Sequence, residues 1–137
     1  MKYSLIYIDN DDIPELIVGD PIDSRNGGVY TYHNGDSVEL TYLTLRCNMD
    51  GYIEKNNIFA VYFWWMDEEG YYIYEMKNGT LNQTDTFLIK HTADGNIYTI
   101  NDKEVTESEY NETYDVHSAD FSEVTYCTYD EIMEELS

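Results

Sequence analysis

Basic residues are scarce in this sequence. Its 137 residues include 7 Lys and Arg against 28 Asp and Glu, so the formal net charge at pH 7 is −21. Proteins that bind DNA or RNA obtain much of their affinity from Lys and Arg side chains that neutralise phosphates, which argues strongly against direct nucleic-acid binding. The same charge repels anionic membranes and attracts cations and basic proteins. A charged surface that only keeps the protein soluble is the simpler interpretation.

Cysteine and long apolar runs are also scarce. Cys47 and Cys127 are too few for a disulfide-stapled scaffold, and they lack the CxxC spacing of a zinc or redox motif. We expect two buried thiols, with a single disulfide as the alternative. No segment approaches the roughly 20 apolar residues of a membrane span. The first residues lack the apolar stretch and cleavage site of a signal peptide, which predicts a cytoplasmic protein as written, or an extracytoplasmic one if a leader was trimmed.

Motifs that carry catalysis are missing as well. There is no glycine-rich phosphate loop, no HExxH and no nucleophile elbow, and the histidines His33, His91 and His117 stand on separate predicted elements. Neither cysteine has a neighbouring histidine or a basic surround that would activate its thiol. We therefore expect a non-catalytic binding protein rather than an enzyme, with no cofactor other than a candidate calcium ion.

What the sequence does contain predicts a folded domain. Hydrophobic residues make up 42% and aromatic residues 15% of the chain, which is too apolar for a disordered acidic tail, so residues 1–137 are interpreted as a single acidic β-rich domain. Short apolar runs separated by turn residues predict paired strands. These pairs are residues 3–8 with 15–18, 29–33 with 38–43, 58–65 with 71–76, and 86–90 with 96–100.

The C-terminal quarter has a helical character. Thr106 and Glu109 form a capping box, which predicts a short helix to about residue 114, and Thr128 begins a similar signal for a terminal amphipathic helix. Residues 121–127 between them are predicted to form an edge strand. The expected fold class is therefore α+β, mainly antiparallel β, with a meander of hairpins and one or two short C-terminal helices.

The segment 9–15 is the sharpest local signal. Oxygen ligands recur at alternate positions and a carboxylate follows four residues later, the spacing by which a tight turn surrounds a calcium ion. The segment resembles the calcium loops of dockerin-like and FG-GAP-like repeats, although Tyr7 stands at the first ligand position and Asp12 replaces the usual glycine. Asp9, Asp11 and Glu15 are the candidate calcium ligands, and a plain acidic turn is the alternative.

A wider resemblance includes the same segment. The phrases YSLIYIDNDDIPELIVG, GGVYTYHNG and NDKEVTESEYN are similar to uncharacterised modules of cell-surface lipoproteins from anaerobic Gram-positive bacteria. Those modules normally carry a leader and a helical segment ahead of this strand, whereas the sequence as written begins almost at the strand. The resemblance implies a β-rich fold and an extracytoplasmic location, without an established activity.

Acidic residues dominate the C-terminal region, where one base, Lys103, follows Ile100. Such one-sided charge disfavours the compact state through self-repulsion, which suggests a function for it. The predicted partner-binding residues are Glu107, Glu109, Glu112, Asp130, Glu131, Glu134 and Glu135, with a second patch at Asp67, Glu68 and Glu69. In size and charge the chain is similar to acidic anti-CRISPR proteins and other nucleic-acid mimics.

Two functional interpretations follow. The favoured one is a protein-binding inhibitor that imitates nucleic acid and blocks the basic groove of a nuclease or similar enzyme. The alternative is an extracytoplasmic module, with calcium as a candidate stabilising ion, that binds sugar or protein through its aromatic side chains. The candidate platform consists of Tyr62, Phe63, Trp64, Trp65, Tyr71, Tyr72 and Tyr74, of which we expect at least one pair to be buried in the core because strand side chains alternate.

Overall fold

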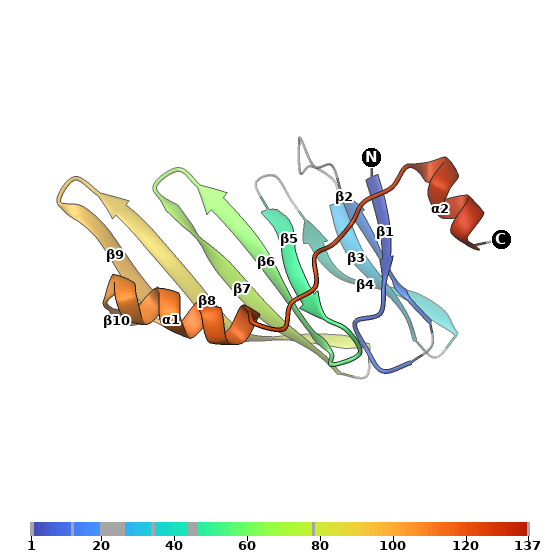
Figure 1. The fold of residues 1–137 in the computed structure, drawn as a ribbon, viewed down its shortest axis with the longest axis horizontal. Helices are drawn as coiled ribbons and strands as arrows, with labels where there is room; N and C mark the ends of the chain where they lie inside the picture. The colour runs from blue at the N-terminus through green and yellow to red at the C-terminus, as the bar shows by residue number, and fades with distance from the viewer. Residues whose placement is uncertain are drawn as a thin grey trace.

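The computed structural model describes residues 2–11, 13–19, 27–33, 35–43, 47–77 and 79–136. Within these ranges the chain forms two antiparallel sheets and two helices (Figure 1). The predicted class, α+β and mainly antiparallel β with hairpins ahead of short helices, is confirmed. No helix in the described ranges is long and apolar enough to cross a membrane.

The first sheet contains four strands in sequence order. They are β1 (Lys2–Ile6), β2 (Glu15–Gly19), β3 (Gly27–His33) and β4 (Asp36–Leu43). Along β2 buried and half-buried side chains alternate, as expected for a strand with one face in the core. The β1–β2 hairpin closes on the pair Ile6 and Glu15, so Asp9 and Asp11 lie in its loop and Glu15 is the first residue of β2.

The second sheet contains six strands, also in sequence order. They are β5 (Cys47–Ile53), β6 (Ile58–Trp65), β7 (Glu68–Lys77), β8 (Thr80–Thr92), β9 (Gly95–Ile100) and β10 (Lys103–Val105). β6 is rich in β-branched and aromatic residues and lies between β5 and β7. The predicted single meander is therefore divided into two sheets.

The two faces of the six-stranded sheet pack against different partners. On one face Phe59 and Val61 join a buried cluster with Ile8, Ile17 and other apolar side chains of the four-stranded sheet. The opposite face carries a second buried cluster of Ala60, Ile73, Phe87 and Tyr110. Because strand side chains alternate, β6 contributes to both clusters.

The first helix, α1 (Glu107–Ser118), covers the second of these faces. The Thr106 hydroxyl accepts a hydrogen bond of 3.1 Å from the Glu109 backbone N–H, as the capping box predicts. The helix continues past the expected end near residue 114. Its last turns pack on the sheet, where Tyr114 and His117 lie with ring centroids 5.3 and 5.5 Å from Phe87.

The chain after α1 crosses from one sheet to the other (Figure 1). Ser122 exchanges backbone hydrogen bonds of 2.7 and 3.2 Å with Tyr52 of β5, and Cys127 exchanges bonds of 2.7 and 2.9 Å with Tyr3 of β1. The predicted edge strand over residues 121–127 is wrong, because a segment that spans two sheets pairs with each only at a single bridge. Cys127 is half-buried.

The second helix, α2 (Tyr129–Leu136), follows and packs beside β1. The Thr128 hydroxyl accepts from the Glu131 N–H at 3.3 Å, as predicted. Two strands were not predicted. β10 is three residues long, and β5 contains Asp50 and Gly51 at a bulge, which interrupts the apolar alternation. The start of β8 was missed because its first half is polar and exposed.

Candidate functional site

The structure brings the three predicted calcium ligands together. Carboxylate oxygens of Asp9, Asp11 and Glu15 lie within 4.8 Å of one another, where the β1–β2 loop meets the start of β2. Two Asx turns shape the loop. The Asp11 N–H donates to the Asp9 carboxylate at 3.1 Å, and the Ile13 N–H donates to the Asp11 carboxylate at 2.9 Å. The sequence prediction that these groups converge is thus matched by the geometry. Position 12 lies outside the described residues.

Glu15 is the unusual member of this acidic loop. Its side chain is fully buried and accepts hydrogen bonds from the Ile8 N–H at 2.7 Å and the Thr31 hydroxyl at 3.1 Å. Burial, together with the charge of Asp9, raises the pKa of Glu15 to about 7, although the hydrogen bonds that Glu15 accepts lower it in part. Burial, followed by the hydrogen bond with Asp11, also raises the pKa of Asp9. Hard oxygen ligands gathered in this way suit a calcium ion.

The predicted partner-binding acids lie at three separate places. Those of α1 and those of α2 are at opposite ends of the long axis of the molecule (Figure 1). The third group lies at the turn between β6 and β7, where Asp67 is exposed and Glu68 and Glu69 are half-buried. Six of the helical acids are exposed, namely Glu107, Glu109, Glu112, Asp130, Glu131 and Glu134, whereas the side chain of Glu135 lies outside the described set. The acids therefore do not form one continuous row.

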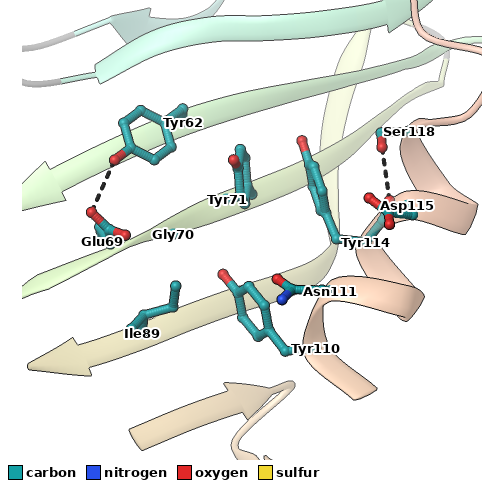
Figure 2. A pocket seen from close by; sticks show the side chains of 10 residues that line it. All are labelled: Tyr62, Glu69, Gly70, Tyr71, Ile89, Tyr110, Asn111, Tyr114, Asp115 and Ser118. Carbon is teal, nitrogen blue, oxygen red and sulfur yellow. Dashed lines mark hydrogen bonds between the residues drawn. The ribbon is translucent and has the colours of Figure 1, made fainter. Parts of the chain in front are cut away.

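A cavity that the sequence did not predict lies between α1 and the sheet. It has a volume of about 310 Å³ and takes its walls from β6, β7, β8 and α1 (Figure 2). Four tyrosines line it, namely Tyr62, Tyr71, Tyr110 and Tyr114, together with the carboxylates of Glu69 and Asp115. We call it the tyrosine cavity.

Hydrogen bonds and stacking hold most of these tyrosines in place. The Tyr62 hydroxyl donates to a Glu69 oxygen at 3.1 Å, and the rings of Tyr71 and Tyr114 stack with centroids 3.9 Å apart. The Tyr114 hydroxyl donates to the carboxylate of Asp50, the residue that the bulge of β5 leaves without a strand partner. Burial and the bond to Glu69 raise the pKa of Tyr62 to about 12, so the ring stays neutral at physiological pH.

Tyr110 stands apart from the other three tyrosines. Its side chain is 3% exposed, and its hydroxyl has no hydrogen-bond partner among the described residues. Edge contacts with Phe87 at 5.6 Å and Tyr98 at 5.4 Å fix the ring. Burial raises the pKa of Tyr110, because the charged form would be poorly solvated. A buried hydroxyl without a partner is unfavourable, which makes this atom a candidate ligand contact.

The structure distributes the predicted aromatic platform over both faces of the sheet. Tyr62 and Tyr71 point into the tyrosine cavity, whereas Phe63 stacks on Tyr72 on the other face with centroids 4.4 Å apart. The expectation that at least one pair is buried is wrong. Phe63 is 8% exposed but Trp65 on the same face is 53% exposed, and on the opposite face Tyr62 is only half-buried. The other platform members, Trp64 and Tyr74, are exposed and half-buried respectively.

Sequence reasoning missed Tyr110 and Tyr114. They are four residues apart, which places them on one face of α1, and that spacing was the available signal. The spacing does not predict which strands α1 covers.

Comparison with known proteins gives no match. No protein-family model fits the chain, and neither a curated protein nor a solved structure is significantly similar to it.

Proposed function

We propose that this chain is a non-catalytic domain that binds a basic protein. Its contact surface is the α1 face, which we define as Tyr62, Glu69 and Tyr71 of the sheet together with the exposed acids Glu107, Glu109 and Glu112 of α1. One observation carries the proposal. Tyr62, Tyr71 and Glu69, which the sequence suggested in separate groups, line one cavity. The helix that covers this cavity, α1, carries the three exposed acids.

Physical chemistry supports this combination. A net charge of −21 raises the encounter rate with a basic partner, and it also discriminates against acidic ones. Tyrosine side chains bury a large apolar area at low entropic cost and are enriched among residues that dominate binding energy. The acids steer the partner and the tyrosines anchor it.

A nucleic-acid-mimicking inhibitor, similar in action to acidic anti-CRISPR proteins, is the most specific form of this proposal. Its support is the net charge, which a basic nucleic-acid-binding groove would attract. The three separate acidic places favour a partner that contacts one of them over a groove that follows a continuous row. Competition by duplex DNA distinguishes a mimic from another binder of basic proteins, since only a mimic occupies the groove in which the partner binds nucleic acid.

The test compares two charge reversals of equal size. One variant changes Glu107, Glu109 and Glu112 of α1 to Lys, and the matched control changes Asp130, Glu131 and Glu134 of α2 to Lys. Basic proteins retained from a nuclease-treated bacterial lysate are identified, purified and titrated against each variant at low and high salt. We expect the α1 variant to lose binding and the α2 variant to lose only part of the salt-dependent association rate. Equal losses would place the contact surface elsewhere.

A calcium-stabilised extracytoplasmic module is the second candidate, and the geometry of the acidic loop favours it. Calcium that binds only the folded state raises stability by mass action, by about 2.7 kcal/mol at one hundred times the dissociation constant. Melting temperature is measured with calcium, with magnesium and with a chelator. A rise with calcium that Asp11→Ala removes and Asp94→Ala retains supports the module, because Asp94 is an exposed acid in another turn. No rise at millimolar calcium would count against the ion.

A further inference from the structure

We propose that the tyrosine cavity receives a lysine side chain of a protein partner and holds its ammonium group between Tyr110 and Glu69. The inference rests on the proposed function in taking the partner as the source of the lysine. The choice of an ammonium group rests on the cavity alone.

The chemistry of the walls selects a cation. Four aromatic rings and two carboxylates line the cavity, and none of its described lining residues is Lys, Arg or His. Aromatic faces carry negative potential and attract a cation placed over them, most strongly where water is excluded. An anion would meet the like charges of Glu69 and Asp115 here, and a neutral sugar would gain nothing from those charges.

The buried end of the cavity has an unused polar atom. The Tyr110 hydroxyl lies in the cavity wall, is shielded from solvent and has no described partner (Figure 2). A hydroxyl oxygen accepts hydrogen bonds, and an ammonium group donates three. An ammonium at this end therefore satisfies an atom that is otherwise unfavourably buried.

The size of the tyrosine cavity and the chemistry of its two ends fit an alkyl chain with a charged tip. A volume of about 310 Å³ lies at the lower limit of ligand pockets, which run from about 300 to 1,000 Å³. Ile89 provides an apolar wall for methylene groups, and the exposed residues Asn111 and Asp115 mark the side open to solvent. A four-carbon stem can enter from this side and carry its charge inward.

The bonds of Glu69 favour ammonium over guanidinium. One of its oxygens already accepts from the Tyr62 hydroxyl at 3.1 Å, and His91 Nε2 lies 3.9 Å from that same oxygen. A guanidinium binds best when it engages both carboxylate oxygens in a planar pair. Here one oxygen of that pair is already shared with Tyr62, whereas a compact ammonium needs only a single oxygen from each neighbour.

The experiment titrates the protein with small probes by calorimetry. The probes are Nα-acetyl-lysine N-methylamide, the arginine and norleucine counterparts, and n-butylammonium. Norleucine has the same apolar stem without the charge, so we expect the lysine probe to bind at least about tenfold more tightly, the effect of one hydrogen bond to a charged group. The lysine probe should also exceed the arginine probe.

Two single-hydroxyl deletions locate the site. Tyr110→Phe should weaken binding of the lysine probe about tenfold without lowering the melting temperature, because it removes a hydroxyl that has no partner among the described residues. Tyr98→Phe is the matched control, since Tyr98 packs against Tyr110 but does not line the cavity. It should leave affinity unchanged.

Equal binding of lysine and norleucine probes, no binding at all, or equal effects of the two deletions overturns the inference. If the arginine probe binds as tightly as the lysine probe, the choice of an ammonium group is wrong. If n-butylammonium binds as tightly as the lysine probe, the cavity does not require a lysine of a protein partner. If the α1 reversal abolishes partner binding while no probe binds, the proposed function stands and only this inference fails. If the lysine probe binds but no basic protein is retained, the proposed function fails instead.

Discussion

The acidic loop and the tyrosine cavity differ in how the chain builds them. The loop takes its three carboxylates from the segment 9–15, and hydrogen bonds between near neighbours shape it. The cavity takes its walls from three strands and a helix that are brought together only by the packing of α1 on the sheet. A site formed within one segment depends on local turns, whereas a site formed between elements depends on the spacing of the whole sheet.

The largest effect on stability should come from a change in the spacing between β7 and β8. A Cβ atom added at Gly70, which lines the tyrosine cavity, would lie 1.8 Å from the Phe87 carbonyl oxygen, so the backbone must move. We expect Gly70→Ala to lower the free energy of unfolding by about 3 kcal/mol and to disturb the cavity. Chemical denaturation of the variant measures the loss.

Gly19→Ala is the control for this prediction in the four-stranded sheet. A Cβ atom there would lie 3.6 Å from the Tyr126 hydroxyl oxygen, an ordinary contact. Its cost should stay below about 1 kcal/mol, the span of strand propensities. If the two glycine variants are equally stable, the close approach of β7 and β8 does not control this region.

The second effect concerns the pH dependence of the acidic loop. The pKa of Glu15 is about 7 in the folded protein against 4.5 as the ordinary value, so folding favours the protonated carboxyl. This contribution is fully present below pH 4.5 and is lost as pH rises towards 7 and above. The full shift corresponds to about 3 kcal/mol.

Glu15→Gln tests this dependence because it removes the charge, keeps an oxygen to accept from the Ile8 N–H and has an amide that can donate to the Thr31 hydroxyl oxygen. Relative to the wild type, the variant should gain up to about 3 kcal/mol in free energy of unfolding between pH 4.5 and pH 8 in a chelator. Urea denaturation across this range measures the difference. Parallel profiles for the two proteins would show that Glu15 is not the group responsible.

A smaller effect is expected where the cavity is tied to β5. Tyr114→Phe removes the hydrogen bond to Asp50 and leaves the stacking on Tyr71 intact. We expect a loss of about 1 kcal/mol in the free energy of unfolding. A double-mutant cycle with Asp50→Ala measures the coupling, and additive losses would show that this bond contributes nothing to stability.

The smallest effect should be that of Tyr110→Phe. Because the hydroxyl has no described partner, its removal should change the free energy of unfolding by less than about 0.5 kcal/mol, or raise it slightly. A clear loss of stability, measured by denaturation, would show that the hydroxyl is satisfied in the folded protein, for instance by ordered water.

The difference between structure formed within one segment and structure formed between elements also explains what could be predicted from the sequence. The strand pairs, both helix caps and the convergence of Asp9, Asp11 and Glu15 follow from short-range patterns, and the structure has them. The division into two sheets and the strand β5 could not be predicted, because a bulge at Asp50 interrupts the alternation on which strand prediction depends.

The tyrosine cavity depends on a choice that no local pattern encodes. Fifteen tyrosines occur in the chain, and each fits a half-buried strand or helix position equally well. Only the placement of α1 on the sheet separates Tyr110, whose hydroxyl is enclosed, from neighbours such as Tyr114, which finds a partner.

The bridging segment between the helices has a consequence for self-association. An edge strand exposes unpaired backbone groups that can recruit a strand from another molecule, and β1 and β5 are both edge strands of their sheets. Residues 122–127 touch both edges, one bond pair at Tyr52 and one at Tyr3. A single length of chain thus covers one point on each of two edges, and a cut that detached it would free those backbone groups for intermolecular β-pairing.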